Sequence, residues 1–300
     1  MIRLQTPVTD CPCQTPISLE DHILMLGSCF TDEIGKQLTA FGFHTCVNPF
    51  GTLYNPVSVR NSLRRLMSGK PFTPEECIRM GAGSDLICSF SHHTAAARKT
   101  HEEFLIRANE NLQEAHRFFG ESTVLILTLG TAWCYEHLER GGVVSNCLKR
   151  DAREFRRFRL GVEETAGALQ AIRELAGDRK VIFTVSPIRH LKDGAHGNQL
   201  SKATLLGGID RIQAAAAPEG TGGPASLART DYFPAYEIMM DELRDYRFYA
   251  EDMTHPSAQA VDYIRERFLD WALPEGEHAR LEENIRAWKR SQHRPISSKA

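Results

Sequence analysis

The chain has 300 residues, with 36 Lys and Arg against 38 Asp and Glu, so its formal net charge is −2. Hydrophobic residues make up 42% and aromatic residues 8% of it, which is typical of a folded globular protein and not of a disordered chain. The slightly acidic balance argues against nucleic-acid binding through bulk charge. No apolar run approaches the roughly 18 residues that a membrane-spanning helix needs.

Hydrophobic periodicity divides the first half of the chain into alternating strands and helices. Strands are predicted at His22–Leu26, His44–Phe50 and Thr123–Gly130, with a short one at Asp85–Phe90. Helices are predicted at Thr31–Phe41, Pro56–Met67 and Lys99–Phe119. The run TVLILTLG at Thr123–Gly130 is the most hydrophobic in the chain, which is typical of a central strand buried on both faces of a parallel sheet.

The second half repeats this alternation. Helices are predicted at Gly161–Leu175, Gln199–Ala217, Tyr236–Leu243 and Pro256–Trp271. Strands are predicted at Lys180–Val185 and Ser226–Tyr232, with a loop at Gly220–Pro224. The pattern predicts an α/β fold, a three-layer α/β/α sandwich with a mainly parallel sheet. One domain over residues 1–272 is the simplest organisation, followed in residues 273–300 by a polar helix at Glu277–Trp288 and a basic tail.

Eight cysteines are present, but none forms a CxxC pair. Several lie in apolar runs, where a free thiol behaves as a small hydrophobic side chain. A chain of this length needs no disulfides to hold its core, so we expect reduced thiols. The N-terminal sequence lacks the apolar segment of a signal peptide. Together these features favour a cytoplasmic protein.

Residues that follow the predicted strands are the candidates for chemistry, because ligands bind beyond the carboxyl ends of strands in such sheets. Ser28 comes directly after the first strand and directly before a helix. Backbone N–H groups at the start of a helix can stabilise an oxyanion there. The alternative is that Ser28 only caps the helix.

A second candidate is the pair Asp252 and His255, followed by Pro256 at the expected start of a helix. A carboxylate three residues before a histidine can fold back and hold the imidazole in one tautomer, as the aspartate of a catalytic triad does. Either residue could instead serve only as a helix cap. The topology of such a sheet allows Ser28 and the Asp252–His255 pair to meet at one edge.

The order Ser, Asp, His is that of SGNH, or GDSL-like, hydrolases, and several segments resemble the GSCFA family. The segment Gly27–Phe30 with Thr31 is similar to the signature for which that family is named, with Thr in place of the final Ala. Further similar segments are Asn48–Pro56 (NPFGTLYNP), Ser91–His93 (SHH), Leu129–Trp133 (LGTAW), Ser186–His190 (SPIRH), Asn198–Ala203 (NQLSKA) and Tyr249–Pro256 (YAEDMTHP). The resemblance covers about residues 22–270 and implies an SGNH-hydrolase-like (flavodoxin-like) fold.

The resemblance also implies site residues. Ser28 matches the nucleophile, and Asp252 and His255 match the final acid and base. The N–H groups of Ser28 and Gly51 would form the oxyanion hole, and Gly130 matches the glycine of the third block. That block's asparagine is replaced here by Ala132, so another side chain has to supply the donor. Asn48, Asn55 and Asn146 are the candidates, with Asn48 favoured because it ends a strand.

The implied activity is that of a serine esterase or O-acyltransferase acting on an acyl ester of a small polar or carbohydrate molecule. His255 would take the proton of Ser28, and Asp252 would stabilise the imidazolium. His190, Arg189, His93 and Thr131 are the candidate substrate-binding residues. The missing asparagine favours the alternative, a non-catalytic ligand-binding module on the same scaffold.

No cofactor or metal is expected. The chain has neither a GxGxxG nor a P-loop motif, and the G-x-S-x-G nucleophile elbow is absent. A zinc site built from His92, His93 and His190 is a further alternative without a supporting ligand spacing. The basic segment Lys149–Arg159 (KRDAREFRRFR) is interpreted as a solvated helix face or loop. The partner expected is therefore a small ester substrate, and neither nucleic acid nor a membrane, while the oligomeric state is left open.

Overall fold

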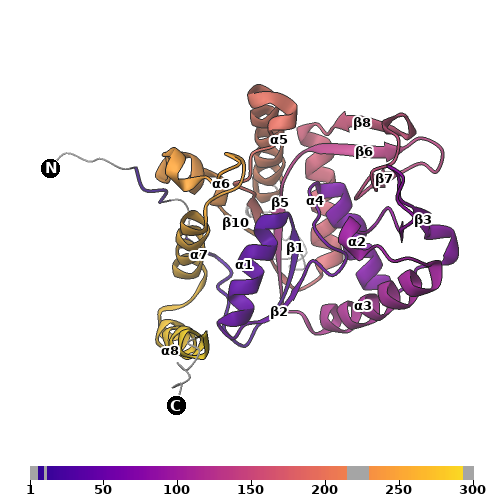
Figure 1. Cartoon of the computed structure of the whole chain (residues 1–300). Helices are drawn as coiled ribbons and strands as arrows, with labels where there is room; N and C mark the ends of the chain where they lie inside the picture. Colours follow the sequence, from indigo (N-terminus) through magenta and orange to yellow (C-terminus); the bar gives the residue numbers. More distant parts are fainter. Residues whose placement is uncertain (1–5, 10–11, 215–229, 293–300) are drawn as a thin grey trace, which may run out of the picture.

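The computed structural model describes residues 6–9, 12–214 and 230–292 and has a five-stranded parallel sheet at its centre (Figure 1). The strands of this sheet are β1 (His22–Gly27), β2 (His44–Val47), β5 (Val124–Leu129), β9 (Lys180–Val185) and β10 (Thr230–Phe233). Their spatial order is β10-β9-β5-β1-β2, with every pair parallel. The direction in which successive strands are added therefore reverses between β1 and β5, which is the point at which ligands bind in sheets of this kind.

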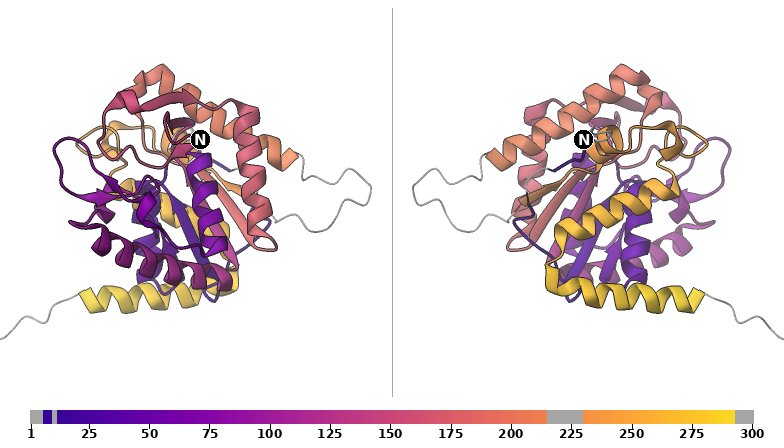
Figure 2. Two further views of the ribbon diagram at one scale, coloured as in Figure 1. Left: turned by 90° about the vertical axis from the view of Figure 1, so that its right-hand side faces the viewer. Right: turned by 90° about the vertical axis from the view of Figure 1, so that its left-hand side faces the viewer.

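Helices cover both faces of the sheet and complete the three-layer α/β/α sandwich (Figure 2). The long helices are α1 (Cys29–Ala40), α2 (Pro56–Ser68), α3 (His101–Glu121), α4 (Val162–Ala176), α5 (Gly194–Ala214), α7 (Ala258–Ala272) and α8 (Glu275–Gln292). Short helical turns are Pro74–Glu76, Thr94–Ala96, Ala152–Glu154, Leu191–Asp193, α6 (Ala235–Glu237), a π-helical turn at Ile238–Glu242 and Tyr246–Phe248. None of the helices in the described ranges has the length and apolarity to span a membrane.

The core is divided by the alternation of side chains along the strands. In β1, Leu24 and Leu26 pack with α2, α3, α4 and α5, whereas Ile23 and Met25 pack with α1 and α7 on the other face. All six residues of β5 are buried, as the sequence predicts for a central strand. The strands β1, β5 and β9 and all the long helices were thus predicted in type, with ends that differ by a few residues.

Two parts of the predicted pattern need correction. A three-stranded antiparallel sheet of β6 (Trp133–His137), β7 (Val143–Val144) and β8 (Phe155–Arg159) was not predicted. Of the eleven residues of the basic segment interpreted as a solvated helix face or loop, the last five form the edge strand β8, in which Phe155 is buried and the three arginines are exposed. The segment Asp85–Phe90 contributes only β4 (Ile87–Cys88), which pairs with β3 (Ile78–Arg79).

Other predicted boundaries shift for local reasons. Helix α7 begins at Ala258 and not at Pro256, because Ser257 caps it by accepting a hydrogen bond from the N–H of Ala260. The predicted loop Gly220–Pro224, the start of the predicted strand Ser226–Tyr232 and the basic tail after 292 lie outside the described residues. Helix α8 packs on the end of α1, where Asn284 Nδ2 donates to the carbonyl of Phe41 at 2.9 Å.

Candidate active site

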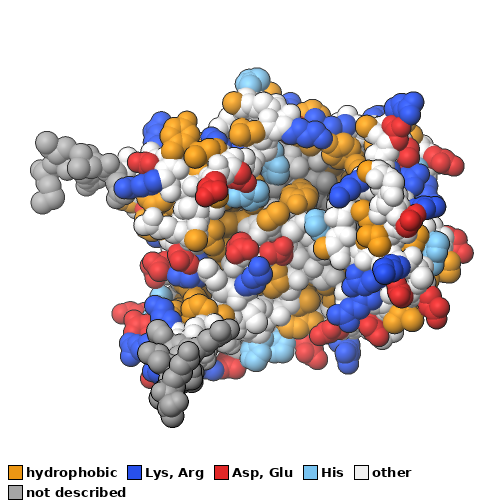
Figure 3. Space-filling view, viewed as in Figure 1, with side chains coloured by type: hydrophobic (Ala, Val, Ile, Leu, Met, Phe, Trp, Pro, Cys, Tyr) orange, Lys and Arg blue, Asp and Glu red, His pale blue; other side chains and the backbone are white. Residues whose placement is uncertain are grey.

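The carboxyl ends of the strands surround a cavity of about 610 Å³. Its walls come from the start of α1, the segment after β2, the segment after β5, the antiparallel sheet, the segment after β9 and the loop before α7. The lining residues are Cys29, Tyr54, Asn55, Thr131, Trp133, Tyr135, Val144, Ser145, Asn146, Cys147, Arg157, Ile188, Arg189, His190, Leu191, Lys192, Asp193, Thr254 and His255. Histidine and hydrophobic side chains gather in the middle of the face shown in Figure 3.

Asp252 and His255 form the acid–imidazole couple that the sequence predicts. Nδ1 of His255 lies 2.6 Å from Oδ2 of Asp252, and the other carboxylate oxygen accepts the backbone N–H groups of Thr254 and His255, each at 2.9 Å. These hydrogen bonds lower the pKa of Asp252 to about 2, with the N–H of His255 as the largest cause. The carboxylate is therefore ionised at neutral pH, and Nε2 of His255 is the ring nitrogen left to meet a ligand.

The Asp252–His255 loop is held next to the segment after β9. The backbone N–H of Arg189 donates to the carbonyl of Thr254 at 3.1 Å, and the Arg189 guanidinium donates to the carbonyl of Met253. Met253 itself has a positive φ of 55°, which lets the chain double back between the acid and the histidine. These contacts place His255 beside His190 in the cavity wall.

His190 lies deeper than His255. Its backbone N–H donates to Oδ1 of Asn198 at 2.9 Å, and its Nε2 is buried without a hydrogen-bond partner. Burial, followed by the charge of Lys202, lowers the pKa of His190 to about 4, so the ring is neutral at pH 7. The Nε1 of Trp133 is buried without a partner in the same wall. Both nitrogens are shielded from solvent, so the two residues form part of the cavity wall without exposing these atoms.

A basic and aromatic wall faces these histidines. The guanidinium of Arg157, on β8, lies 4.0 Å from the ring centroid of Trp133 and 5.6 Å from that of Tyr135, both on β6. Arg157 also pairs with Asp193, whose side chain is nearly buried. Stacked guanidinium and indole groups are a surface to which polar rings and acyl groups bind.

Several predicted site residues do not reach this cavity. The Ser28 side chain is 0% exposed, and its Oγ donates to Oγ of Ser186 at 3.0 Å. The geometric expectation that the Ser28 hydroxyl opens into the crevice is therefore wrong, and its role as the nucleophile stays a prediction. His93 caps a short helical turn through Nδ1, which accepts the N–H of Ala95, and it packs on Gly51 away from the cavity.

The predicted oxyanion donors are largely occupied. Asn48 accepts the N–H of Gly27 at 2.8 Å and donates to Asp32 at 2.6 Å, and it is not among the residues that line the cavity, so its role as the missing donor stays a prediction. The N–H of Gly51 donates to the carbonyl of Asn48 at 2.7 Å, and that of Gly130 to the carbonyl of Tyr54 at 2.8 Å.

The other two candidate asparagines do line the cavity. Asn55 accepts the N–H of Ser58 through Oδ1, and Asn146 accepts the N–H of Leu148 in the same way. In each case Nδ2 is the part of the amide that can serve a ligand. Of the predicted substrate-binding residues, Thr131, Arg189 and His190 are brought together with His255.

The histidines of the zinc alternative are not brought together. His92 is enclosed by Phe50, Phe72 and Phe104, and its Nδ1 lies 2.7 Å from Oγ of Ser89. Among the residues that the structure describes, no group of three or more His, Cys, Asp or Glu side chains could hold a metal ion. Seven cysteines in these ranges are free thiols, and Cys11 lies outside them.

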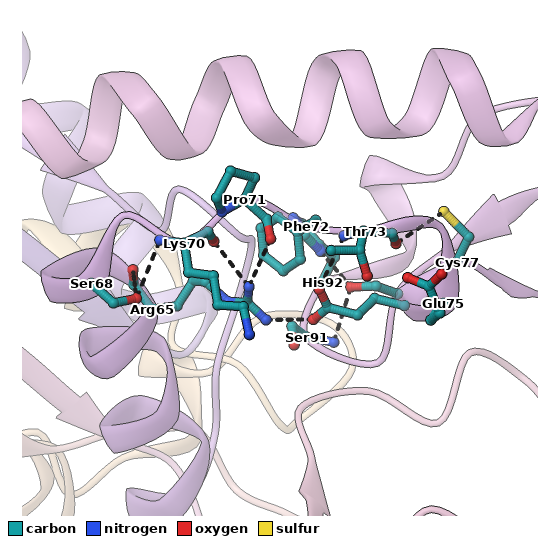
Figure 4. Close-up of polar contacts among 12 residues, drawn as sticks. Arg65, Ser68, Lys70, Pro71, Phe72, Thr73, Glu75, Cys77, Ser91 and His92 are labelled. Atoms are coloured by element: carbon teal, nitrogen blue, oxygen red, sulfur yellow. Dashed lines mark hydrogen bonds and ion pairs between the residues drawn. The ribbon is translucent and has the colours of Figure 1, made fainter.

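A smaller cavity of about 270 Å³ is lined by residues of α2 and of the antiparallel sheet, among them Arg65, His137 and Val144. Figure 4 shows the Arg65 side chain, which donates to the carbonyls of Lys70 and Pro71 at 2.9 Å and 3.2 Å. Arg65 also pairs with Glu76. Because these contacts occupy the guanidinium, Arg65 has a structural role there.

Fold and cavity together define an α/β sandwich protein with an acid–histidine couple at the carboxyl edge of its sheet. The chain belongs to the GSCFA family, whose model matches residues 22–268. No curated protein and no solved structure matches the chain. Cys29, Tyr54, Tyr135, Arg157 and Asp193 were not among the predicted site residues, although Cys29 stands directly beside Ser28 in the signature segment.

Proposed function

We propose that this protein is an acyl hydrolase or O-acyltransferase that cleaves esters in the cavity at the carboxyl edge of the sheet. The observation that carries the proposal is the 2.6 Å contact between Nδ1 of His255 and Oδ2 of Asp252 at the cavity wall. This contact fixes the imidazole tautomer and directs Nε2 to act as a general base. The ionised Asp252 carboxylate then stabilises the imidazolium that forms.

The nucleophile comes from the turn between β1 and α1. In the first step the nucleophile attacks the ester carbonyl while His255 takes the proton of the nucleophile. The released alcohol then receives that proton. At the start of α1 the N–H of Thr31 already donates to the carbonyl of Ser28 at 2.8 Å, and the side chain of Ser28 makes no capping hydrogen bond. The two N–H groups before it, those of Cys29 and Phe30, are the donors for the oxyanion, together with Nδ2 of Asn55.

The substrate is an ester of a small polar or carbohydrate molecule. Trp133 and Tyr135 offer aromatic rings, while the Nδ2 groups of Asn55 and Asn146 offer polar contacts. Arg189 and Lys192 add positive charge to the wall. A mixture of this kind suits a hydroxylated ring that carries an acyl group.

The test is hydrolysis of a panel of aryl esters by the full chain and by His255→Ala and Asp252→Asn. Loss of a general base costs about 10²–10⁴ in rate, so we expect a fall of that size in kcat/KM for His255→Ala. His101→Ala is the matched control, because His101 is exposed at the start of α3, away from the cavity. Equal rates for His255→Ala and the wild type would contradict the proposal.

A ligand-binding module on the same scaffold is the second candidate, and the enclosed Ser28 hydroxyl favours it. In that case the wild type and His255→Ala both leave every ester intact. The protein should still bind acylated sugars, and this binding can be measured by the fluorescence of Trp133, with Trp133→Phe as the control. Turnover that depends on His255 excludes this candidate.

A further inference from the structure

Two adjacent side chains at the start of α1 face opposite ways. Ser28 is 0% exposed, and its hydroxyl donates to Oγ of Ser186, directly after β9. The Cys29 side chain is partly exposed and lines the same cavity as His255. We propose that the thiol of Cys29, and not the hydroxyl of Ser28, is the nucleophile. This inference rests on the acyl transfer proposed above.

The backbone explains why the two side chains diverge. Gly27 has a φ of +156° and is so close to β5 that a Cβ would lie 2.4 Å from the carbonyl oxygen of Thr128. Ser28 is extended, with φ −71° and ψ −179°, and Cys29 is the first helical residue. At a junction from extended to helical backbone, consecutive side chains point to different sides. One of the two must enter the sheet, and it is Ser28.

The thiol has the surroundings that a nucleophile needs. Its Sγ lies 3.5 Å from Oη of Tyr54, whose pKa burial raises to about 12, so the phenol keeps its proton. The ring of Tyr54 meets that of His190 edge to face, with centroids 6.1 Å apart. The N–H groups at the start of α1 favour a negatively charged atom at this position. The thiol and the two histidines therefore line one cavity, into which the start of α1 projects Cys29.

A second cysteine, Cys147, lines the cavity, but it lies in the loop between β7 and β8 and not at a helix start. Cys147 is therefore the competing thiol against which an experiment has to discriminate.

The reaction balances without a further reactant. His255 Nε2 takes the thiol proton as Sγ bonds to the acyl carbon, and the bond from that carbon to the alcohol oxygen breaks. The proton passes to the leaving alcohol. Water or an acceptor hydroxyl then attacks the thioester, His255 takes its proton, and the carbon–sulfur bond breaks as the proton returns to sulfur. The net reaction is ester plus water, or acceptor alcohol, giving acid or new ester plus the first alcohol.

The first test locates the acyl group. The full chain is mixed with p-nitrophenyl acetate, quenched in acid and digested, and the acetyl group is located by mass spectrometry. We expect it on Cys29 in the wild type and in Ser28→Ala, and absent in Cys29→Ala. Turnover of Cys29→Ala should fall at least about 1000-fold, as for loss of a nucleophile. Cys77→Ser, remote from the cavity, is the control expected to match the wild type. An acetyl group on Ser28 or Cys147, or wild-type turnover by Cys29→Ala, overturns the inference.

The second test does not depend on the ester. Alkylation by iodoacetamide at neutral pH should be at least about tenfold faster at Cys29 than at Cys77, and it should slow in His255→Ala. If the wild type hydrolyses no ester but Cys29 still reacts faster, the proposed substrate class fails and the nucleophile stands. If Cys29 reacts no faster than Cys77, the nucleophile assignment fails, whatever the esters show.

Discussion

Replacing Lys202 with Met tests how the buried amine joins the two loops that carry the site. The side chain is 1% exposed in α5, and its Nζ donates to the carbonyls of Gly130 and Ser186, each at 2.7 Å. Those carbonyls follow β5 and β9, directly before Thr131 and the segment that carries His190. Burial lowers the pKa of Lys202 to about 7. A neutral amine still has two N–H groups, which is one for each carbonyl.

The lowered pKa of Lys202 predicts the direction in which the free energy of unfolding changes with pH. Between about pH 7.5 and 9.5 the unfolded chain protonates this amine, whereas the native protein holds it mostly neutral, so unfolding takes up a proton. The free energy of unfolding of the wild type should therefore rise with pH by up to about 1.36 kcal/mol per pH unit, or close to 3 kcal/mol over the interval. Below about pH 7 the Lys202 amine is charged in both the native and the unfolded state, and above about pH 10.5 it is neutral in both. The free energy of unfolding therefore changes with the titration of Lys202 only between these limits.

The assay is urea denaturation of the wild type, Lys202→Met and Lys36→Met across that interval. Subtracting the curves cancels the tyrosines and cysteines, which titrate alike in all three proteins. Lys36 is exposed on α1, so Lys36→Met should keep the wild-type slope. Lys202→Met should also lose stability at every pH, by about 1–3 kcal/mol for each carbonyl left without a donor. Parallel curves for the wild type and Lys202→Met would refute the assignment of a lowered pKa to this amine.

Two further substitutions test the frame of the site. His92 is buried, and burial lowers its pKa to about 4, so His92 should contribute about 3 kcal/mol to the stability that the wild type loses between pH 6.5 and 4, as the unfolded chain protonates it. His190, whose pKa is lowered in the same way, contributes a loss of its own, so His92→Phe should reduce the acid loss by the share of His92 alone. An unchanged loss would count against a buried neutral imidazole at this position. Gly51 has a φ of +86°, and a Cβ there would lie 2.3 Å from Cβ of His93, so Gly51→Ala should lower the free energy of unfolding by more than the strain of about 1–2 kcal/mol alone. Gly83→Ala, with a φ of +74° and open space, supplies the strain-only control, and equal melting temperatures of the two variants would contradict the steric argument.

The buried strands could be predicted because their hydrophobic runs have no other stable place. The run at β5 is buried on both faces, and β9 begins and ends where the apolar run KVIFTV does. The antiparallel sheet could not be predicted in the same way. Its strand β8 reads FRRFR, in which charge dominates over apolar alternation, and only the pairing with β6 shows which side is inward. An edge strand rich in arginine is hard to predict from hydrophobic alternation, because solvent and not the core covers one of its faces.

The site was predicted in position better than in detail. Asp252 and His255 contact each other because they are three residues apart in one loop, a separation that local geometry alone can satisfy. Asn48 was chosen because it ends a strand, yet its φ of 42° turns the side chain back onto Gly27 and Asp32. Sequence position indicates which loop a residue occupies, but the direction of its side chain depends on backbone angles that the sequence does not display.

The same reasoning explains why the choice between Ser28 and Cys29 needed the three-dimensional structure. The topology of the sheet fixes a ligand site at the ends of β1 and β5, whichever residues follow those strands. It does not determine which of two neighbours at the turn faces that site, because a shift of one residue at the end of a strand reverses the side. Here Gly27 lies close to Thr128, the Ser28 side chain is buried and hydrogen-bonded to Ser186, and Cys29, the first residue of α1, faces the cavity. The Ser28 hydroxyl therefore connects the end of β1 to the segment after β9, while the neighbouring Cys29 lines the cavity.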